Sequence, residues 1–155
     1  FFLYCNRQYI IQISTYSPQS RKAQRRPRSM KEEDKLSKEI IGAAIEVHRH
    51  IGPGMLESAY EECLCKELEI RDIAFERQKP LAVVYKGITL DCGYKLDVVV
   101  EGKVILELKS INKFESIHDA QLLAYLKLAD LKLGILINFN VPILKDGIKR
   151  IVNNL

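Results

Sequence analysis

The chain has 155 residues, of which 47% are hydrophobic and 28% are charged, a composition close to that of ordinary globular proteins. This length allows one domain with a hydrophobic core but not two. The 8 Gly, 5 Pro and 4 Cys exclude collagen-like, disulfide-scaffold and low-complexity classes. No apolar run approaches the ~20 residues of a membrane span, and the opening residues lack the order of charges of a signal peptide. We therefore expect a cytoplasmic protein without membrane contact.

The net charge of +4 is unevenly distributed along the chain. Residues 1–30 contain no acidic residue and six basic ones, namely Arg7, Arg21, Lys22, Arg25, Arg26 and Arg28. The 18 basic and 20 acidic residues that remain give residues 31–155 a net charge of about −2. The overall positive charge is therefore no argument for nucleic-acid binding by the body of the chain.

The first 30 residues differ in character from the rest. The stretch 14–29 is polar, Pro-punctuated and positively charged, so it cannot bury enough apolar area to offset its ordering entropy. We predict a disordered basic N-terminal extension over residues 1–30 and a folded domain over residues 31–155, with the functional protein beginning at Met30. The alternative is a basic arm that binds phosphates.

Helical and strand-like periodicities follow each other along the folded part. In chain order, the predicted elements are helices over residues 36–51 and 56–72, strands over 73–78, 81–85, 88–100 and 104–109, a helix over 116–129, a strand over 133–139 and a short last element over 148–152. Gly52-Pro53-Gly54 ends the first helix, and Lys86-Gly87 is a tight hairpin turn. This order predicts one mixed α/β or α+β layer structure.

The four cysteines are Cys5, Cys63, Cys65 and Cys92, and no two of them have the C-x2-C spacing of a zinc or redox site. Two residues apart on a helix, Cys63 and Cys65 point in nearly opposite directions. We predict buried reduced thiols.

Two carboxylates interrupt strands that are otherwise apolar. Asp97 precedes three valines, and Glu107 lies within Val104–Lys109, so each acid occupies a position where an ionised group needs a partner or a metal. Glu107 and Lys109 are two residues apart, which places them on the same face of a strand. The tight turn between the two strands brings Asp97 alongside them.

This arrangement fits metal-assisted hydrolysis of a phosphodiester. Carboxylate oxygens are ligands that Mg²⁺ prefers, and the ion would acidify a water and neutralise charge on the phosphate, while Lys109 would position the water. The alternative is a cross-strand ion pair on a solvated face.

Two further features bear on the choice. Gln121 lies in the middle of the predicted apolar stripe of Ile117, Tyr125 and Leu128, where it needs a polar partner. Glu57 falls in the first turn of the second helix, where the helix dipole alone could explain it.

Taken together, Gly54-x-x-Glu57-x-x-Tyr60, Asp97, Glu107-x-Lys109 and Gln121-x-x-x-Tyr125 resemble the GxxExxY protein family, which is assigned to the PD-(D/E)XK nuclease superfamily. The resemblance covers residues 35–152 and includes the segments at 136–142 and 146–150.

The resemblance implies a restriction-endonuclease-like core, a mixed central sheet flanked by helices, with the active site where the central strands splay. It makes Asp97 and Glu107 metal-binding acids, Glu57 a further acid near the metal and Lys109 the catalytic lysine. Gln121 and Tyr125 match the Q-h-x-x-Y motif, whose residues shape the site and contact DNA. The proline of the superfamily name is absent, since Leu96 precedes Asp97.

The leading hypothesis is a Mg²⁺-dependent nuclease, with Mn²⁺ as a substitute, that acts on DNA. The runner-up is a catalytically inactive relative that binds nucleic acid or a protein partner, and a third reading is a protein-interaction module without nucleic-acid contact. Three acids around one point repel each other, so we expect at least one of Glu57, Asp97 and Glu107 to have a raised pKa.

Overall fold

The computed structural model describes residues 28–154. Its elements are, in chain order, α1 (Arg28–Ile51), α2 (Glu57–Ile70), β1 (Phe75–Tyr85), β2 (Ile88–Val100), β3 (Val104–Lys109), α3 (Ser116–Ala129), β4 (Leu133–Asn138), the 3-10 helix η1 (Leu144–Gly147) and β5 (Ile148–Val152). Helix α1 begins at Arg28, a few residues before the predicted domain boundary. The rest of the predicted N-terminal extension lies outside the described residues.

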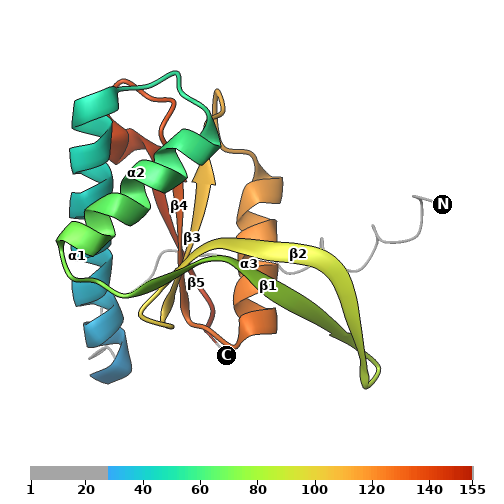
Figure 1. The fold of residues 1–155 in the computed structure, drawn as a ribbon. Helices are drawn as coiled ribbons and strands as arrows, with labels where there is room; N and C mark the ends of the chain where they lie inside the picture. Colours follow the sequence, from blue (N-terminus) through green and yellow to red (C-terminus); the bar gives the residue numbers. More distant parts are fainter. Residues whose placement is uncertain (1–27, 155) are drawn as a thin grey trace, which may run out of the picture.

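The strands form one five-stranded sheet in the order β1-β2-β3-β4-β5. Strands β3 and β4 are parallel and the other neighbours are antiparallel, because helix α3 forms the crossover between β3 and β4. Helices α1 and α2 cover one face of the sheet and α3 covers the other (Figure 1), with a separate hydrophobic cluster on each side. The predicted mixed sheet flanked by helices is confirmed.

Strand β1 is one continuous strand and not the two that the sequence predicted. It pairs with β2 from Phe75 to Tyr85, with an irregularity between Leu81 and Val83. Pro80 lies within it, which is tolerated because β1 is an edge strand and pairs on one side only among residues 28–154. The predicted turn at Lys86-Gly87 is confirmed, since both residues have positive φ.

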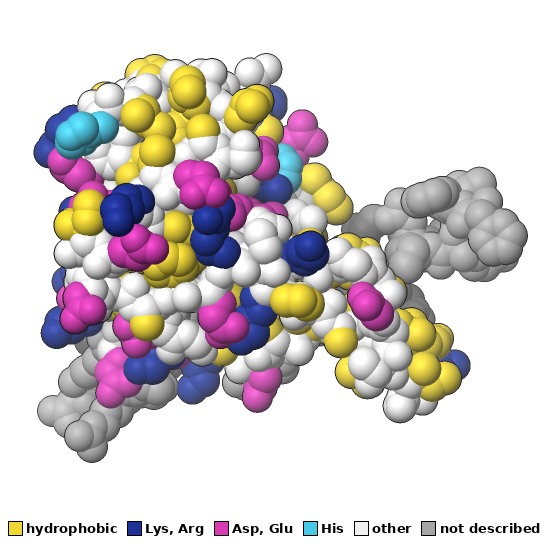
Figure 2. Space-filling model, in the orientation of Figure 1, with side chains coloured by type: hydrophobic (Ala, Val, Ile, Leu, Met, Phe, Trp, Pro, Cys, Tyr) yellow, Lys and Arg dark blue, Asp and Glu magenta, His cyan; other side chains and the backbone are white. Residues whose placement is uncertain are grey.

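Beyond its pairing with β3, strand β2 leaves the sheet together with β1. The two form a projecting hairpin, called here the β1–β2 arm (residues 79–96), that extends to one side of the molecule (Figure 1). Hydrophobic side chains gather on its surface (Figure 2), among them the exposed Val84, Tyr85, Ile88, Leu90 and Tyr94.

Helix α3 is rotated relative to the predicted stripe. Its buried residues are Leu122, Tyr125 and Leu126, while Ile117 and Leu128 are exposed. The helix is apolar on most of its surface, so periodicity alone could not orient it. Gly134 of β4 lets Leu122 approach closely, because a Cβ there would lie 2.8 Å from the Leu122 side chain.

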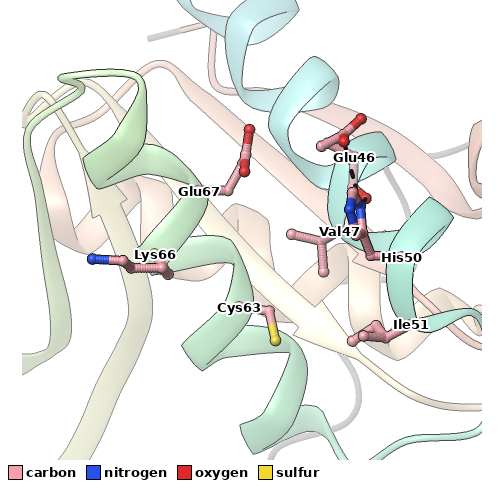
Figure 3. Close-up of a pocket in the computed structure, with 7 residues that line it drawn as sticks. All are labelled: Glu46, Val47, His50, Ile51, Cys63, Lys66 and Glu67. Atoms are coloured by element: carbon pink, nitrogen blue, oxygen red, sulfur yellow. Dashed lines mark hydrogen bonds and ion pairs between the residues drawn. The ribbon is translucent and has the colours of Figure 1, made fainter.

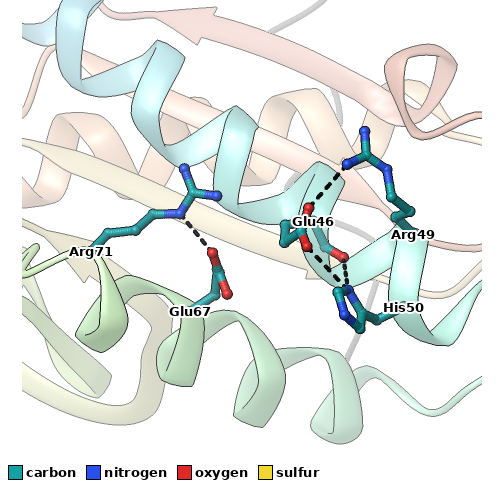
Figure 4. Close-up of polar contacts among 5 residues, drawn as sticks. All are labelled: Glu46, Arg49, His50, Glu67 and Arg71. Carbon is teal, nitrogen blue, oxygen red and sulfur yellow. Dashed lines mark hydrogen bonds and ion pairs between the residues drawn. The ribbon is translucent and has the colours of Figure 1, made fainter.

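Helices α1 and α2 enclose a small pocket of about 220 Å³ at their surface (Figure 3). Ion pairs lie beside it, including Arg71–Glu67 at 2.8 Å and Arg49–Glu46 at 3.2 Å (Figure 4). Solvent-exposed pairs of this kind contribute about 1 kcal/mol or less. None of the predicted site residues lines this pocket.

The prediction of buried cysteines is only partly correct. Cys65 is buried, and burial raises the pKa of its thiol to about 11. Cys63 is partly buried, whereas Cys92 is exposed because it lies on the projecting arm. Cys5 lies outside the described residues.

Within residues 28–154, no helix has both the length and the apolar character needed to cross a membrane.

Candidate active site

The two strand carboxylates lie where the sheet divides. Strands β2 and β3 pair from Val100–Val104 to Val98–Leu106, so this register places Asp97 opposite Glu107 at the next position. There β2 departs with β1, while β3 continues along β4 to Lys109. Asp97 Oδ2 accepts a hydrogen bond of 2.9 Å from the Leu108 backbone N–H. The acids therefore lie at the point, called here the fork, where the β1–β2 arm separates from β3 and the central sheet.

Glu107 is nearly inaccessible to solvent, with 5% of its surface exposed. Its Oε1 accepts a hydrogen bond of 3.0 Å from Lys109 Nζ, which agrees with the same-face placement expected from the sequence. Its Oε2 is buried and has no hydrogen-bond partner among the described residues. A buried carboxylate oxygen in this state requires a proton or a cation.

The electrostatics of the fork agree with that requirement. Burial, with a smaller contribution from the neighbouring Asp97 carboxylate, raises the pKa of Glu107 to about 7, although Lys109 acts to lower it. Burial also raises the pKa of Asp97, although the hydrogen bond from the Leu108 N–H and the charge of Lys109 act to lower it. The expectation of a raised pKa is confirmed, although burial contributes more than the mutual repulsion of the acids.

Lys109 is the cation that the fork already contains. Burial alone would lower its pKa, but the carboxylates of Glu107, Glu57 and Asp97 outweigh burial and raise it. The ammonium group is therefore held in its charged form beside the acids.

Glu57 reaches the same region from the other side of the sheet. It is the first residue of α2, and its Oε1 accepts a hydrogen bond of 3.3 Å from the backbone N–H of Ser110, which directly follows Lys109. The Ser110 hydroxyl donates to the Met55 carbonyl at 2.7 Å. The end of β3 and the start of α2 are thus joined, and the charge of Glu57 raises the pKa of both Asp97 and Glu107.

Tyr60 explains the spacing of the Gly-x-x-Glu-x-x-Tyr segment. Its ring is fully buried and stacks on Phe139 at 4.3 Å. Its hydroxyl donates to the Gly52 carbonyl at 2.7 Å and accepts from the Met55 N–H at 3.1 Å. Gly54 has a φ of 96°, which a residue with a side chain rarely adopts. Together these contacts hold the loop that positions Glu57.

Glu61 is a buried acid that the sequence analysis missed. It lies one turn after Glu57 and accepts hydrogen bonds from Arg77 Nε at 3.0 Å and Gln78 Nε2 at 2.7 Å. Gln78 has a φ of 46° and interrupts the β1–β2 pairing at the position of Asp97. The sequence shows Glu61 as an acid one helical turn after Glu57, but its contacts with Arg77 and Gln78 become visible only in the folded structure.

Asn138 is a second residue without a predicted role. It is paired with Lys109 across the parallel β3–β4 ladder. Its amide is buried, accepts from the Ile111 N–H at 3.1 Å and donates to the Ile111 carbonyl at 2.8 Å. These bonds hold the segment that leaves Lys109. In the sequence, the feature that could have indicated this role is a single amide side chain in an otherwise apolar predicted strand.

Gln121 and Tyr125 lie on α3 and border the fork. Gln121 Nε2 donates to the Tyr125 hydroxyl at 3.0 Å, so Tyr125 is the polar partner that Gln121 was expected to need. Burial raises the pKa of Tyr125, and the charge of Glu107 adds to the effect. Both residues line one pocket with Lys109.

The structure thus brings Glu57, Asp97, Glu107 and Lys109 within mutual electrostatic influence. Among residues 28–154, however, no three His, Cys, Asp or Glu side chains form a group that could hold a metal ion. Each carboxylate instead makes its own contact with the protein, Glu107 with Lys109, Asp97 with Leu108 and Glu57 with Ser110.

A family model described as the PD-(D/E)XK nuclease superfamily matches residues 34–151, which is more than half of the chain and includes every residue of the fork. No curated protein and no solved structure matches the chain. The acids and the lysine lie where two strands diverge in a mixed sheet, within the matched segment. The chain belongs to the PD-(D/E)XK nuclease superfamily.

Proposed function

We propose that this protein is a divalent-metal-dependent nuclease of the GxxExxY type that hydrolyses phosphodiester bonds in DNA. The observation that carries the proposal is the buried Glu107 Oε2, which has no hydrogen-bond donor among the described residues. This oxygen lies at the fork with Asp97 and beside an ammonium group. Glu33 Oε2 and Asp119 Oδ1 are also buried without a partner in the described part of the chain, but Glu107 combines this state with the neighbouring Asp97 carboxylate, which raises its pKa.

The carboxylates suit Mg²⁺ chemically, with Mn²⁺ as a substitute, although among residues 28–154 they do not form a three-ligand group. Asp97 and Glu107 would hold the ion through hard carboxylate oxygens, and Glu57 would contribute from the start of α2. The cation, when bound, supplies an acidified water and neutralises charge that develops on the phosphate. It would also relieve the repulsion between Asp97 and Glu107 that contributes to the raised pKa of Glu107.

The residues of the chain perform the remaining tasks. Lys109 places a positive charge 3.0 Å from Glu107 and can orient the attacking water and stabilise the phosphate oxygens. Glu57 and Asn138 accept hydrogen bonds from the backbone N–H groups of the two residues that follow Lys109, Ser110 and Ile111 respectively. Gln121 and Tyr125 contact the DNA from α3.

A cleavage assay tests the proposal. The full chain is incubated with linear, circular and single-stranded DNA in Mg²⁺, in Mn²⁺ and in EDTA. We expect cleavage only with a metal, and loss of about 10²- to 10³-fold in rate for Lys109→Ala, since one charged group that stabilises the reaction is removed. Lys145→Ala alters an exposed lysine of η1 and serves as the matched control. Cleavage that Lys109→Ala leaves unchanged would refute the assignment.

The metal-binding role is tested separately by titration calorimetry. Asp97→Asn and Glu107→Gln should weaken Mg²⁺ binding because each removes a carboxylate ligand. Lys109→Ala should bind the ion as well as the parent chain or better, because a nearby positive charge is gone. DNA binding by the parent chain without metal binding or cleavage would support the alternative, a catalytically inactive module that binds nucleic acid.

A further inference from the structure

A pocket of about 530 Å³ opens beside the candidate active site, between the β1–β2 arm and α3. Its lining includes Val83 and Tyr94 from the arm, Ile117, Gln121 and Tyr125 from α3, and Lys109 from the end of β3. The size lies within the range typical of sites for small organic groups. Because Lys109 belongs to both, the pocket and the fork are continuous.

The walls are mainly apolar and aromatic. Tyr94 and Tyr125 face each other with ring centroids 6.2 Å apart at an interplanar angle of 60°. Tyr94 is 47% exposed and Ile117 is 64% exposed, so both side chains are accessible to a ligand that enters the pocket. An open tyrosine ring backed by aliphatic side chains offers a stacking surface for a flat aromatic group.

The charge of the lining narrows the class of ligand. The polar groups of the lining are the ammonium group of Lys109, the imidazole of His118, the amide of Gln121 and the hydroxyls of Tyr94 and Tyr125, and no Asp or Glu is among the described residues that line it. The aromatic wall suits a flat ring, the Gln121 amide suits a ring with hydrogen-bonding edges, and the Lys109 ammonium group suits a ligand attached to a negative group. A nucleobase next to a phosphodiester has these properties.

We propose that this pocket receives the unpaired base of the nucleotide next to the bond being cut, so that the substrate is single-stranded DNA. The inference rests on the proposed function and adds the substrate class to it. A base within a duplex is stacked and paired, and it can enter a pocket only after it is flipped out at a cost of a few kcal/mol. The free-energy cost of moving a base into the pocket is much smaller for a single strand, because its bases are already unpaired.

Metal-free binding measures this without any need for catalysis. Fluorescence anisotropy of the full chain in EDTA compares a labelled 20-mer single strand with the same sequence as a duplex. We expect tighter binding of the single strand and a loss of about 5- to 100-fold for Tyr94→Ala, from the removal of one stacking surface. Tyr94→Phe keeps the ring and should restore binding. Tyr85→Ala, which removes an exposed tyrosine of the same arm outside the pocket, should bind as the parent chain does.

A second variant keeps the test decisive if Tyr94→Ala does not fold. Ile117→Asp introduces a negative charge at an exposed position of the lining and should also weaken single-strand binding. Equal affinity for duplex and single strand, or unchanged single-strand affinity in both pocket variants, would overturn the inference. Tighter binding of a single-stranded RNA of the same sequence would overturn the assignment to DNA.

The inference and the proposed function can fail separately. Tyr94-dependent binding of single strands without cleavage of any DNA would retain the base pocket and refute the nuclease proposal. Metal-dependent cleavage of duplex DNA that is unaffected by Tyr94→Ala would retain the nuclease and refute the base pocket.

Discussion

Glu107 links the chemistry of the fork to a cost in stability. Its carboxyl has an ordinary pKa of about 4.3 in the unfolded chain but a pKa of about 7 in the folded protein. Between these two pH values the folded state binds more protons than the unfolded state. The contribution of Glu107 to the free energy of unfolding is therefore highest below the unfolded pKa of about 4.3 and falls as the pH rises from that value through the folded pKa of about 7. The fork is therefore a place where the metal-free fold is strained at neutral pH.

We accordingly expect the metal-free protein to be less stable at pH 8 than at pH 5, with up to about 3 kcal/mol of the difference due to Glu107. Urea unfolding in EDTA at both pH values measures the change, and Glu107→Gln should reduce it. A Glu107→Gln variant with the same pH dependence as the parent chain would show that other groups cause it.

Glu61 offers a second prediction at the scale of the residue. It fixes Gln78 and Arg77 at the interruption of the β1–β2 ladder that accommodates Asp97, so it acts as a positioning residue. Glu61→Gln should weaken Mg²⁺ binding through displacement of Asp97, although Glu61 is no ligand itself.

Glu62 is the matched control, because it binds the same Arg77 at 2.6 Å from an exposed position. Glu62→Gln should leave the Mg²⁺ affinity unchanged. If calorimetry gave the same loss for both variants, the effect would belong to Arg77 and its charge balance and not to the position of Asp97.

At the scale of the element, the connection between α1 and α2 positions one acid of the site. The Tyr60 hydroxyl bridges Gly52 and Met55, and the residues that follow present Glu57 toward Ser110. Burial of the ring supplies stability, while the hydroxyl determines the path of the loop.

Tyr60→Phe separates these two contributions, because it keeps the stack on Phe139 and removes the hydroxyl. We expect a loss of about 1–3 kcal/mol from the backbone groups left without a partner, measured by urea unfolding. We also expect slower cleavage at saturating Mg²⁺. Unchanged cleavage in a destabilised variant would limit Tyr60 to a structural role.

At the scale of the whole molecule, charge is divided between the first 30 residues and the domain. The domain carries about −2 and the N-terminal segment all of the excess positive charge. The first buried side chains of the described core, Glu33 and Leu36, lie beyond residue 30.

Removal of residues 1–29 should therefore leave the melting temperature nearly unchanged, and the salt dependence of DNA binding as well. Thermal melts and anisotropy at 50 and 200 mM salt test this. A truncated chain with a markedly smaller salt slope would show instead that the segment is a basic arm that binds phosphates.

Local patterns predicted much of this protein. The order of helices and strands, the hairpin turn at Lys86-Gly87 and the same-face placement of Glu107 and Lys109 all follow from short-range geometry, because periodicity and turn chemistry depend on neighbouring residues. The superfamily also followed from the sequence, since the spaced acids, lysine and glutamine lie in order along the chain.

Other features depend on contacts between distant segments. The rotation of α3, the continuity of β1 through Pro80, and the roles of Glu61 and Asn138 are set by contacts between different elements of the fold. The burial that raises the pKa of Glu107 likewise arises only when the two layers close over the fork. A one-dimensional pattern records which side chains are available, but desolvation and long-range hydrogen bonding are properties of the packed structure.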